Sequence, residues 1–499
     1  MKMLDLHRQD DGSKMSAPLD RAICDRARRA RDPRFDGLFF TGVKSTGIYC
    51  RPICPAPSPR PENIVYFPTA AAAAAAGLRP CLRCRPETAP GTPAWNGTSA
   101  TVARAMNLIR RGALAGGSID DLAARLGIGT RHLHRLFRQH IGATPKAIAD
   151  NQRLLFAKRL VVETDMPITQ VALAAGYGSI RRFNAAFRKH LGRSPSQLRR
   201  NRPPARRRPD AGFSCTLTLT YRPPYDWDRM LAFFRGRAIP GVEWADERVY
   251  RRTIRLAASG GTIAVRHALK GHALELEVRL PDNRELMAVV ERVRRMFDLD
   301  ANPRAIHQTL NRDPLLAKRV HQLPGLRLPG SWDPFETAVR AVVGQQVSVK
   351  GAVTQLGRIA SLAGTPYQEE GEPHLTGFFP SADELAAADM AAIGMPRKRK
   401  ETLRLLAQQA ASGALLLETI VDLPRFVDTL TSIPGIGDWT ANYVAMRAFG
   451  EPDAFPAADL GILKALQDGQ RRPTVKEARE RADAWRPWRA YAAIYLWMG

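Results

Sequence analysis

Long apolar runs are missing from this sequence. No stretch of about 18 consecutive apolar residues occurs among the 499 residues, and the segment from Met1 to Pro33 is polar and charged. A helix that crosses a bilayer needs about 20 apolar residues, and a secretory leader needs an apolar core. These absences argue against a membrane partner and predict a cytoplasmic protein.

Acidic residues are too few to balance the basic ones. The chain has 75 Lys and Arg residues against 48 Asp and Glu residues, which gives a net charge of +27 at pH 7. An excess of this sign and size favours an anionic polymer as partner. We therefore expect binding to double-stranded DNA and a nucleoid-associated location. The length predicts roughly three domains.

Cysteine is scarce and is confined to the first 215 residues. The six cysteines are Cys24, Cys50, Cys54, Cys81, Cys84 and Cys215. The spacings Cys50-x3-Cys54 and Cys81-x2-Cys84 suit one zinc ion held by four thiolates in a reducing compartment. On spacing alone, a closed site that only stabilises the fold is the first interpretation. Cys24 lies outside the pattern and is interpreted as incidental.

The residues around these cysteines form a more specific pattern. The chain contains Phe39-x-Thr41-x-Val43-x-Ser45-Thr46-Gly47-Ile48-Tyr49-Cys50-Arg51-Pro52-x-Cys54 and Gly77-Leu78-Arg79-Pro80-Cys81-x-Arg83-Cys84. The segment from about residue 18 to 88 resembles the N-terminal methylphosphotriester-receptor domain of the Ada family. The resemblance implies that Cys50 irreversibly accepts a methyl group from a DNA phosphotriester, while the other three cysteines complete the zinc site.

The implied reaction would change the charge of the zinc site and thereby the affinity of the protein for DNA. Four thiolates on one Zn²⁺ carry two net negative charges, which repel DNA phosphates. Methylation of Cys50 removes one negative charge, so we expect the affinity for DNA to rise. The Ada methyltransferase domain for O6-methylguanine is not expected here, because the sequence Pro-Cys-His-Arg does not occur.

A repeat of about 50 residues follows the cysteine region. Two helical pairs, residues 118–140 and 168–190, each end alike, in His140-Ile141-Gly142-x-Thr144-Pro145 and His190-Leu191-Gly192-x-Ser194-Pro195. They predict two helix-turn-helix units joined by a helix over about 145–162. The pair resembles the AraC-type DNA-binding domain. That resemblance implies DNA contacts by the residues that open the second helix of each unit, namely Arg131, His132, Arg181 and Arg182. Phosphate contact or a solvated face remains the alternative for each.

Arginine and proline dominate the next segment. Residues 199–208 contain six arginines, interrupted by Pro203 and Pro204. We interpret residues 203–211 as a linker that either follows DNA phosphates or serves as a solvated tether.

Residues 212–298 predict an α+β domain. Apolar residues alternate with polar ones from Phe213 to Tyr221, further strands are expected at 249–257, 262–267 and 273–280, and helices at 225–235 and 283–297. The motifs Tyr221-x-Pro223-Pro224-Tyr225-Asp226-Trp227-x-x-Met230-Leu231 and Phe297-Asp298-Leu299-x-x-Asn302-Pro303 resemble the N-terminal domain of AlkA-type 3-methyladenine DNA glycosylases.

The C-terminal third carries the motif around which the chemistry is predicted. Ile433-Pro434-Gly435-Ile436-Gly437-Asp438-Trp439-Thr440-Ala441 forms a turn that opens a helix, and Pro456-Ala457-Ala458-Asp459 follows. Glycines let the backbone approach a ligand, and a helix N-terminus favours an anion such as a DNA phosphate. Helices are also expected at 333–347, 397–410, 424–431, 439–449 and from Trp485 to Trp497.

From about residue 213 to its end the chain resembles AlkA, including the helix-hairpin-helix-Gly/Pro-Asp signature. The resemblance implies that Asp459 is the catalytic carboxylate, that Gly435 and Gly437 hold a DNA phosphate, and that Gln346 occupies the position of the DNA wedge. It also implies a base pocket lined by Trp439, Tyr443 and Trp497, for which core packing is the alternative on pattern alone. Related lyases carry lysine where Trp439 stands, so Schiff-base chemistry is not expected. The absence of cysteine after Cys215 likewise excludes the iron–sulfur cluster of other superfamily members.

Some positions depart from the AlkA pattern. Ala458 stands where an acidic residue is usual, Leu460 where an aromatic residue is usual, and Gln346 where an apolar wedge is usual. Asp438, beside the phosphate-binding turn, is electrostatically unfavourable. These departures leave the preferred lesion open.

The sequence thus predicts a multidomain, mainly α protein with α+β parts. The expected units are a zinc domain (1–92), a tandem helix-turn-helix domain (96–202), a linker (203–211), an α+β platform (212–298) and a helix-hairpin-helix glycosylase domain (299–499). The predicted function is a monofunctional DNA-3-methyladenine glycosylase II joined to a methyl-responsive transcriptional activator. Its expected partners are alkylated DNA, promoter DNA and RNA polymerase. The alternatives are an activator whose C-terminal half binds DNA without catalysis, and a glycosylase whose zinc is purely structural.

Overall fold

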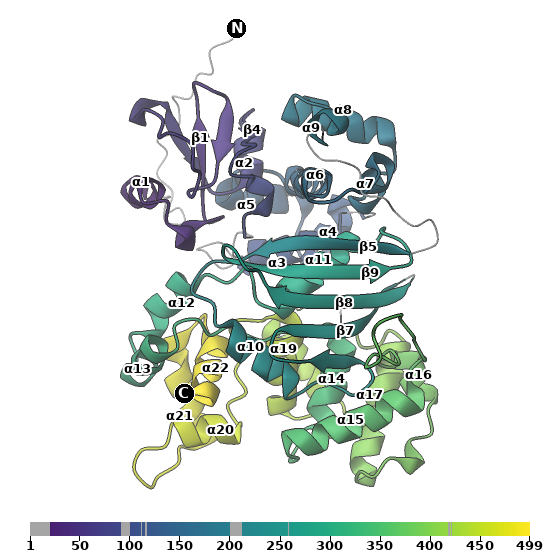
Figure 1. The fold of residues 1–499 in the computed structure, drawn as a ribbon. Helices are drawn as coiled ribbons and strands as arrows, with labels where there is room; N and C mark the ends of the chain where they lie inside the picture. The colour runs from purple at the N-terminus through teal and green to yellow at the C-terminus, as the bar shows by residue number, and fades with distance from the viewer. Residues whose placement is uncertain are drawn as a thin grey trace.

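A five-stranded antiparallel sheet lies at the centre of the molecule (Figure 1). Its strands, in the order β5-β9-β8-β7-β6, are β5 (Phe213–Thr220), β6 (Glu243–Ala245), β7 (Val249–Arg255), β8 (Gly260–His267) and β9 (Ala273–Leu280). Buried and exposed residues alternate along β5, as its period-two pattern predicts. The strands expected in this region are confirmed, while β6 escaped prediction because three residues are too few to show an alternation.

The computed structural model describes residues 20–90, 100–110, 112–114, 117–199, 212–257, 259–417, 420 and 422–499. The linker predicted at 203–211 lies outside these residues. None of the described helices combines the length and apolar character that a membrane span requires.

The cysteine region forms a small second sheet. Its order is β3-β1-β2-β4, with β1 (Phe40–Val43), β2 (Ile48–Cys50), β3 (Ile64–Phe67) and β4 (Arg79–Pro80). Helices α1 (Arg21–Arg29) and α2 (Ala70–Ala75) and the 3-10 turns η1 (Pro33–Phe35), η2 (Pro61–Asn63) and η3 (Pro86–Thr88) complete it. Gly37, which has a φ of +72°, turns the chain ahead of β1, so this strand begins only at Phe40.

The next region confirms the predicted helix-turn-helix repeat. Its helices are α3 (Ala100–Arg110), α4 (Ile119–Arg125), α5 (Thr130–Ile141), α6 (Pro145–Glu163), α7 (Ile168–Ala174), α8 (Ile180–Leu191) and α9 (Pro195–Arg199). Ser118 and Asp121 form a capping box that starts α4. Gly142 and Gly192 end α5 and α8 in the left-handed conformation, which explains why each repeat closes on glycine.

The C-terminal helices pack around α19, whose Ala441, Val444, Ala445 and Met446 are fully buried. The helices after β5 are α10 (Trp227–Arg235), α11 (Leu286–Met296), α12 (Pro303–Leu310), α13 (Pro314–Gln322), α14 (Pro334–Val343), α15 (Val349–Ala363), α16 (Ala382–Ala387), α17 (Arg397–Ala411), α18 (Leu423–Thr431), α19 (Asp438–Phe449), α20 (Leu460–Ala465), α21 (Val475–Ala482) and α22 (Arg489–Met498), with η4 (Met390–Ala392) and η5 (Asp483–Trp485).

Two of the predicted helix boundaries were wrong. The helix expected at 333–347 ends at Val343, and the chain then turns through Gln346, which has a φ of +53°. Trp485 belongs to η5, and the last helix begins only at Arg489. Pro487, which lacks a backbone N–H donor, interrupts the run.

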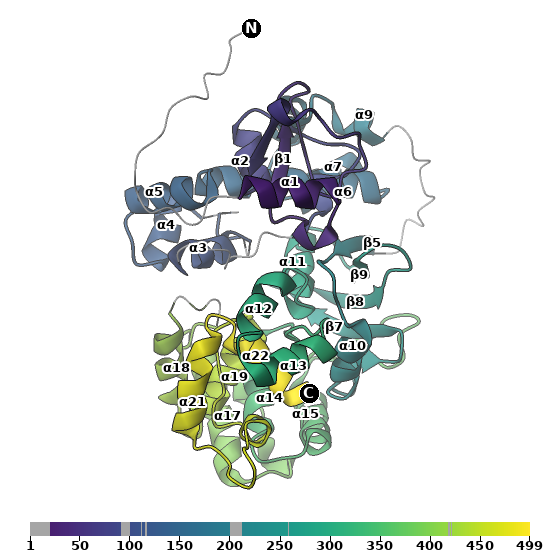
Figure 2. The same ribbon diagram turned by 90° about the vertical axis from the view of Figure 1, so that its left-hand side faces the viewer.

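The two halves of the chain pack against each other, the purple-to-blue part against the teal-to-yellow part in Figures 1 and 2. Arg222 is completely buried there. Its guanidinium donates to the carbonyl oxygens of Asp36 (2.8 Å) and Pro90 (3.3 Å) on one side and of Asp300 (2.7 Å) and Ala301 (3.1 Å) on the other. A buried cation that crosslinks both halves makes their docking specific.

Helix α6 covers the open edge of the central sheet. Arg159 donates to the carbonyl oxygen of Thr218 in β5, and the N–H of Thr218 donates to Glu163 at 3.2 Å. Edge strands left unpaired invite association with other chains. The helix-turn-helix region therefore protects the edge of the platform sheet.

Candidate active site and metal centre

A cavity of about 1140 Å³ opens between the central sheet and the C-terminal helices. The predicted pocket residues Trp439, Tyr443, Asp459 and Trp497 all line it, as does Gln346. Residues that lie more than 100 positions apart in sequence therefore converge on one concave site. A cavity with aromatic walls and a few convergent polar groups is typical of a ligand site.

Asp459 is held at both carboxylate oxygens. The indole N–H of Trp439 donates to Oδ2 at 2.9 Å, and the indole N–H of Trp497 donates to Oδ1 at 2.9 Å. As N-cap of α20, the same Oδ1 also accepts the backbone N–H groups of Gly461 (2.8 Å) and Ile462 (3.1 Å). The carboxylate is thus fixed in position at the cavity wall.

The aromatic side chains form one continuous face beside this carboxylate. The Trp439 and Tyr443 rings stack with centroids 5.2 Å apart and planes 19° apart, and Trp497 lies 6.3 Å from Tyr443. All three side chains are half-buried rather than core residues. They therefore leave π faces available to a planar ligand.

The inner end of the cavity contains residues that the sequence patterns did not single out. Phe233, Arg237 and Arg447 line it. Arg447 donates to the Tyr443 hydroxyl at 2.7 Å, and its guanidinium lies 4.6 Å from the centre of the Phe233 ring. In the sequence, these three residues occur in ordinary helical patterns that do not distinguish them from other core or surface residues. Only the fold brings them to the pocket.

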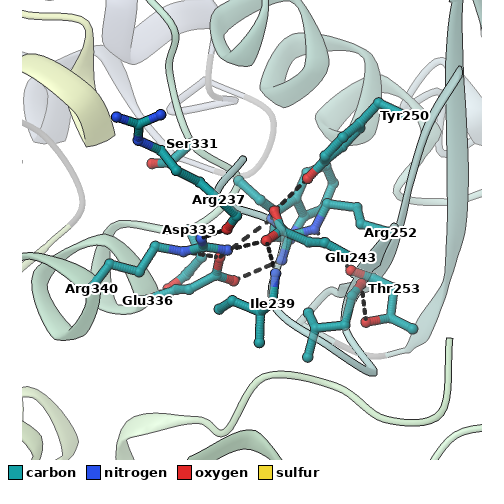
Figure 3. A network of polar contacts seen from close by, with 12 residues as sticks. Arg237, Ile239, Glu243, Tyr250, Arg252, Thr253, Ser331, Asp333, Glu336 and Arg340 are labelled. Atoms are coloured by element: carbon teal, nitrogen blue, oxygen red, sulfur yellow. Dashed lines mark hydrogen bonds and ion pairs between the residues drawn. The ribbon is translucent and has the colours of Figure 1, made fainter. Parts of the chain in front are cut away.

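A buried ionic network supports this inner end (Figure 3). Arg252 of β7 pairs with Glu336 of α14 at 2.6 Å, and Arg340 pairs with Glu336 at 2.6 Å and also with Glu243. Tyr250 donates its hydroxyl proton to Glu243. The network joins the platform sheet to the helical domain, and its charged groups also line the cavity.

The network predicts an acid-sensitive stability. Burial alone would raise the pKa of Glu243, but Arg340 and Arg252 lower it to about 2. A depressed folded-state pKa adds stability that is complete above about pH 4.5 and is lost as the pH falls towards 2. Glu243→Gln should lower the free energy of unfolding at pH 7 by about 3 kcal/mol and flatten its dependence on pH below 4.5.

Urea unfolding at several pH values measures this effect. Glu480→Gln is the matched control. Glu480 is exposed and its ion pair with Lys476 is long, at 3.9 Å, so the loss of this charge should lower the free energy of unfolding by less than about 0.5 kcal/mol. Equal unfolding free energies for the two variants would show that the network does not stabilise the fold.

The turn before α19 has a backbone conformation that requires glycine and leaves its backbone open to a ligand. Gly435 has a φ of +90°, and a Cβ there would lie 2.0 Å from Oγ1 of Thr402. Gly437 is the exposed N-cap of α19 and has open space around it. The backbone N–H groups at this helix start are therefore accessible to an anion.

Asp438 and the other unusual positions have identifiable surroundings. Asp438 forms an ion pair with Arg479 of α21 at 2.7 Å, which offsets its charge beside the turn. Ala458 and Leu460 are exposed and line the cavity next to Asp459. The side chain of Gln346 is exposed at the cavity rim.

The four clustered cysteines meet through the small sheet. Parallel pairing of β2 with β4 places Cys50, at the end of β2, beside Cys81, which follows β4. The Sγ atoms of Cys50, Cys54, Cys81 and Cys84 all lie within 4.8 Å of one another. Tetrahedral zinc with bonds of about 2.3 Å requires sulfurs about 3.8 Å apart. The four thiolates therefore fit one zinc ion.

Polar groups around the cysteines favour charged sulfur. The backbone N–H of Arg51 donates to Sγ of Cys84 at 3.3 Å, and the N–H of Arg83 donates to Sγ of Cys81 at 3.4 Å. Cys50 and Cys54 are partly exposed, whereas Cys81 and Cys84 are buried. Arg51 also forms a buried ion pair with Asp36, whose carbonyl oxygen binds Arg222 at the interface between the halves.

The predicted helix-turn-helix contacts occupy equivalent positions. Arg131 and His132 lie in the first turn of α5, and Arg181 and Arg182 lie in the first turn of α8. All four side chains are exposed. They are therefore available to DNA at the ends of the two helices that enter the groove in this class of domain.

Family comparisons agree with this arrangement. The metal binding domain of Ada matches residues 23–87, a helix-turn-helix domain matches residues 122–201, and the AlkA N-terminal domain matches residues 216–333. The fold and its sites thus define a zinc-binding and helix-turn-helix protein joined to a DNA-glycosylase-like half.

Whole-chain relatives specify the family. The chain is 42% identical over 482 residues, 95% of each protein, to a probable bifunctional transcriptional activator/DNA repair enzyme AlkA of Mycobacterium tuberculosis. It is 36% identical to the DNA-3-methyladenine glycosylase 2 of Escherichia coli, covering 56% of this chain and 96% of that protein. It is 33% identical to the Escherichia coli activator and repair enzyme Ada, covering 34% of this chain and 46% of that protein. The chain belongs to the family of AlkA bifunctional transcriptional activators and DNA repair enzymes.

Proposed function

We propose that the C-terminal half is a monofunctional glycosylase that hydrolyses the N-glycosidic bond of alkylated purines, of the 3-methyladenine type, in duplex DNA. The observation that carries this proposal is Asp459, held by two indole N–H groups in the wall of an aromatic cavity beside an exposed, glycine-lined helix start. Gly435 and Gly437 would hold a phosphate of the lesion strand, and Gln346 would fill the gap left by the lesion.

The aromatic face suits the proposed substrate. A base inside duplex DNA must be extruded before it can react, at a cost of roughly a few kcal/mol. N-alkylated purines are cationic, and the π faces of Trp439, Tyr443 and Trp497 can stack on them with cation–π attraction of about 0.5–2 kcal/mol. Stacking would offset part of the cost of extrusion.

Asp459 is proposed to act on the sugar. As the C1′–N bond breaks, its electron pair leaves with the cationic base, which departs neutral, and water forms the new C1′–O bond and releases one proton to the solvent. The fixed carboxylate would stabilise the oxocarbenium character of the sugar or orient that water. Trp439 occupies the position of the lysine nucleophile in related lyases, so no Schiff base is proposed.

The absence of lyase chemistry can be tested directly. Duplex DNA containing 3-methyladenine should yield free base with an intact strand, and strand breaks should appear only after alkali. Denaturing electrophoresis with and without alkali measures both. Strand cleavage by the protein alone, together with a borohydride-trapped adduct, would show lyase chemistry and contradict this assignment.

For the N-terminal half we propose a methyl-accepting switch at Cys50. Zinc, when bound by the four thiolates, keeps sulfur deprotonated near neutral pH. The Cys50 thiolate would attack the methyl carbon of a DNA methylphosphotriester, so that an S–C bond forms and the C–O bond breaks, with the phosphodiester as leaving group. Loss of one negative charge would then raise the affinity for DNA.

The helix-turn-helix region would convert that event into transcriptional activation. We propose that Arg131, His132, Arg181 and Arg182 contact promoter DNA and that RNA polymerase is the partner of the activated state. The proposed division of the chain remains a zinc domain (1–92), a double helix-turn-helix domain (96–202), a linker (203–211), a platform (212–298) and a glycosylase domain (299–499).

A further inference from the structure

The loop between α14 and α15 holds the proposed wedge residue in an unusual backbone conformation. Gln346 has a φ of +53°, a left-handed value that is common for glycine but that L-residues other than asparagine and aspartate rarely adopt. Its side chain is exposed at the rim of the cavity. Such a conformation persists only where the surrounding structure imposes it.

Gln345, the residue before Gln346, ties this loop to two neighbouring elements. Its side-chain amide donates one hydrogen bond to the carbonyl oxygen of Gly435 at 3.0 Å and a second to Oγ1 of Thr440 at 2.9 Å. Both amide protons are therefore used, and both acceptors belong to the phosphate-binding turn and the start of α19. The backbone carbonyl of Gln345 accepts a hydrogen bond from Arg399 of α17 at 2.6 Å.

The turn on the other side of these bonds is itself fixed. Oγ1 of Thr402 in α17 donates to the carbonyl oxygen of Pro434 at 2.9 Å, and Gly435 has no room for a side chain against Thr402. The wedge loop, the turn and α17 therefore form one hydrogen-bonded unit. Any movement of the turn when it binds a phosphate is therefore passed to Gln346 through these hydrogen bonds.

We propose that Gln345 is a positioning residue that couples the wedge at Gln346 to the phosphate-binding turn. This inference rests on the proposed glycosylase function. Binding of a DNA phosphate by the turn and insertion of Gln346 into the gap in the base stack then occur together. This coupling stabilises the extruded state of the base. Gln345 also lines the cavity, but both of its amide protons are engaged by Gly435 and Thr440, so in this scheme it acts through the wedge and not on the base or the sugar. Its loss should affect extrusion and leave the chemical step intact.

Gln345→Met removes both donors and keeps the length of the side chain, so the loop should still fold. We expect excision of 3-methyladenine from a paired site to slow about tenfold, the effect of losing two neutral hydrogen bonds. Excision from a single-nucleotide bulge, where extrusion costs less, should slow less than twofold.

Gln355→Met is the matched control. Gln355 donates a comparable bond, to the carbonyl oxygen of Gly394 at 3.0 Å, and does not line the cavity. It should match the wild type on both substrates. Equal slowing of Gln345→Met on paired and bulged lesions, or no slowing on either, would overturn the inference.

A second measurement separates this inference from the proposed function. Binding to a duplex with a reduced abasic site flanked by 2-aminopurine should raise fluorescence when the wedge enters the stack. We expect the wild type and Gln355→Met to give the full rise and Gln345→Met to need about tenfold more protein. If the wild type released no base, the glycosylase assignment would fail, while equal fluorescence titrations of Gln345→Met and wild type would overturn the role of Gln345.

Discussion

Asp459→Asn is expected to slow the release of 3-methyladenine from alkylated duplex DNA by at least about 100-fold under single-turnover conditions. The substitution keeps the shape of the side chain but removes the negative charge that would stabilise positive charge on the sugar. The indole N–H groups of Trp439 and Trp497, each 2.9 Å from a carboxylate oxygen, would then face a neutral amide. Affinity for a duplex with an abasic-site analogue should change little.

Asp383→Asn provides the matched control for this substitution. Asp383 is exposed in the first turn of α16 and does not line the cavity. Its variant should release base at the wild-type rate. A normal rate for Asp459→Asn would contradict the catalytic role, and an equal loss of binding and rate would point instead to a damaged DNA interface.

Cys50→Ala is expected to abolish methyl transfer from a DNA methylphosphotriester. The three remaining cysteines, Cys54, Cys81 and Cys84, do not include the sulfur that we propose as nucleophile. Intact-protein mass spectrometry after incubation with methylated DNA should show one added methyl group on the wild type and none on the variant. Release of 3-methyladenine by the C-terminal half should persist, because the cavity lies in a separate part of the fold.

Cys24→Ala tests whether the reaction belongs to the metal site. Burial raises the pKa of the Cys24 thiol to about 12, so this sulfur is a poor nucleophile near neutral pH. The Cys24 variant should still gain one methyl group, and peptide mapping should place it on Cys50. A wild-type protein that gains no methyl group on any of the four clustered cysteines would reduce the zinc to a structural role.

The sites could be predicted because their residues form short motifs, which also show the resemblance to known families. The glycine turn, Trp439 and Asp459 lie within 30 residues of each other, and the four cysteines lie within 35 residues. Short-range spacing of this kind determines which side chains a turn or strand end presents. The repeat of helix, turn and helix was predictable for the same reason, because each unit has its own periodicity and closing glycine.

Contacts between distant segments could not be read from the sequence. No pattern indicated that Trp497 would donate to Asp459, that Gln345 would bridge to Gly435, or that Arg479 would offset Asp438. Arg222 is buried between the two halves, but nothing in the sequence distinguished it from the many other arginines of this basic chain. Such pairings depend on how helices and sheets pack, which residue spacing along the chain does not encode.

Chromatography of the free bases released from alkylated duplex DNA measures glycosylase activity and the role of Asp459 together, with the wild type and Asp459→Asn assayed side by side on one DNA preparation. We expect free 3-methyladenine from the wild type and almost none from the variant over the same time. Equal release by both proteins would contradict the assignment of Asp459, and no release by the wild type would contradict the glycosylase itself.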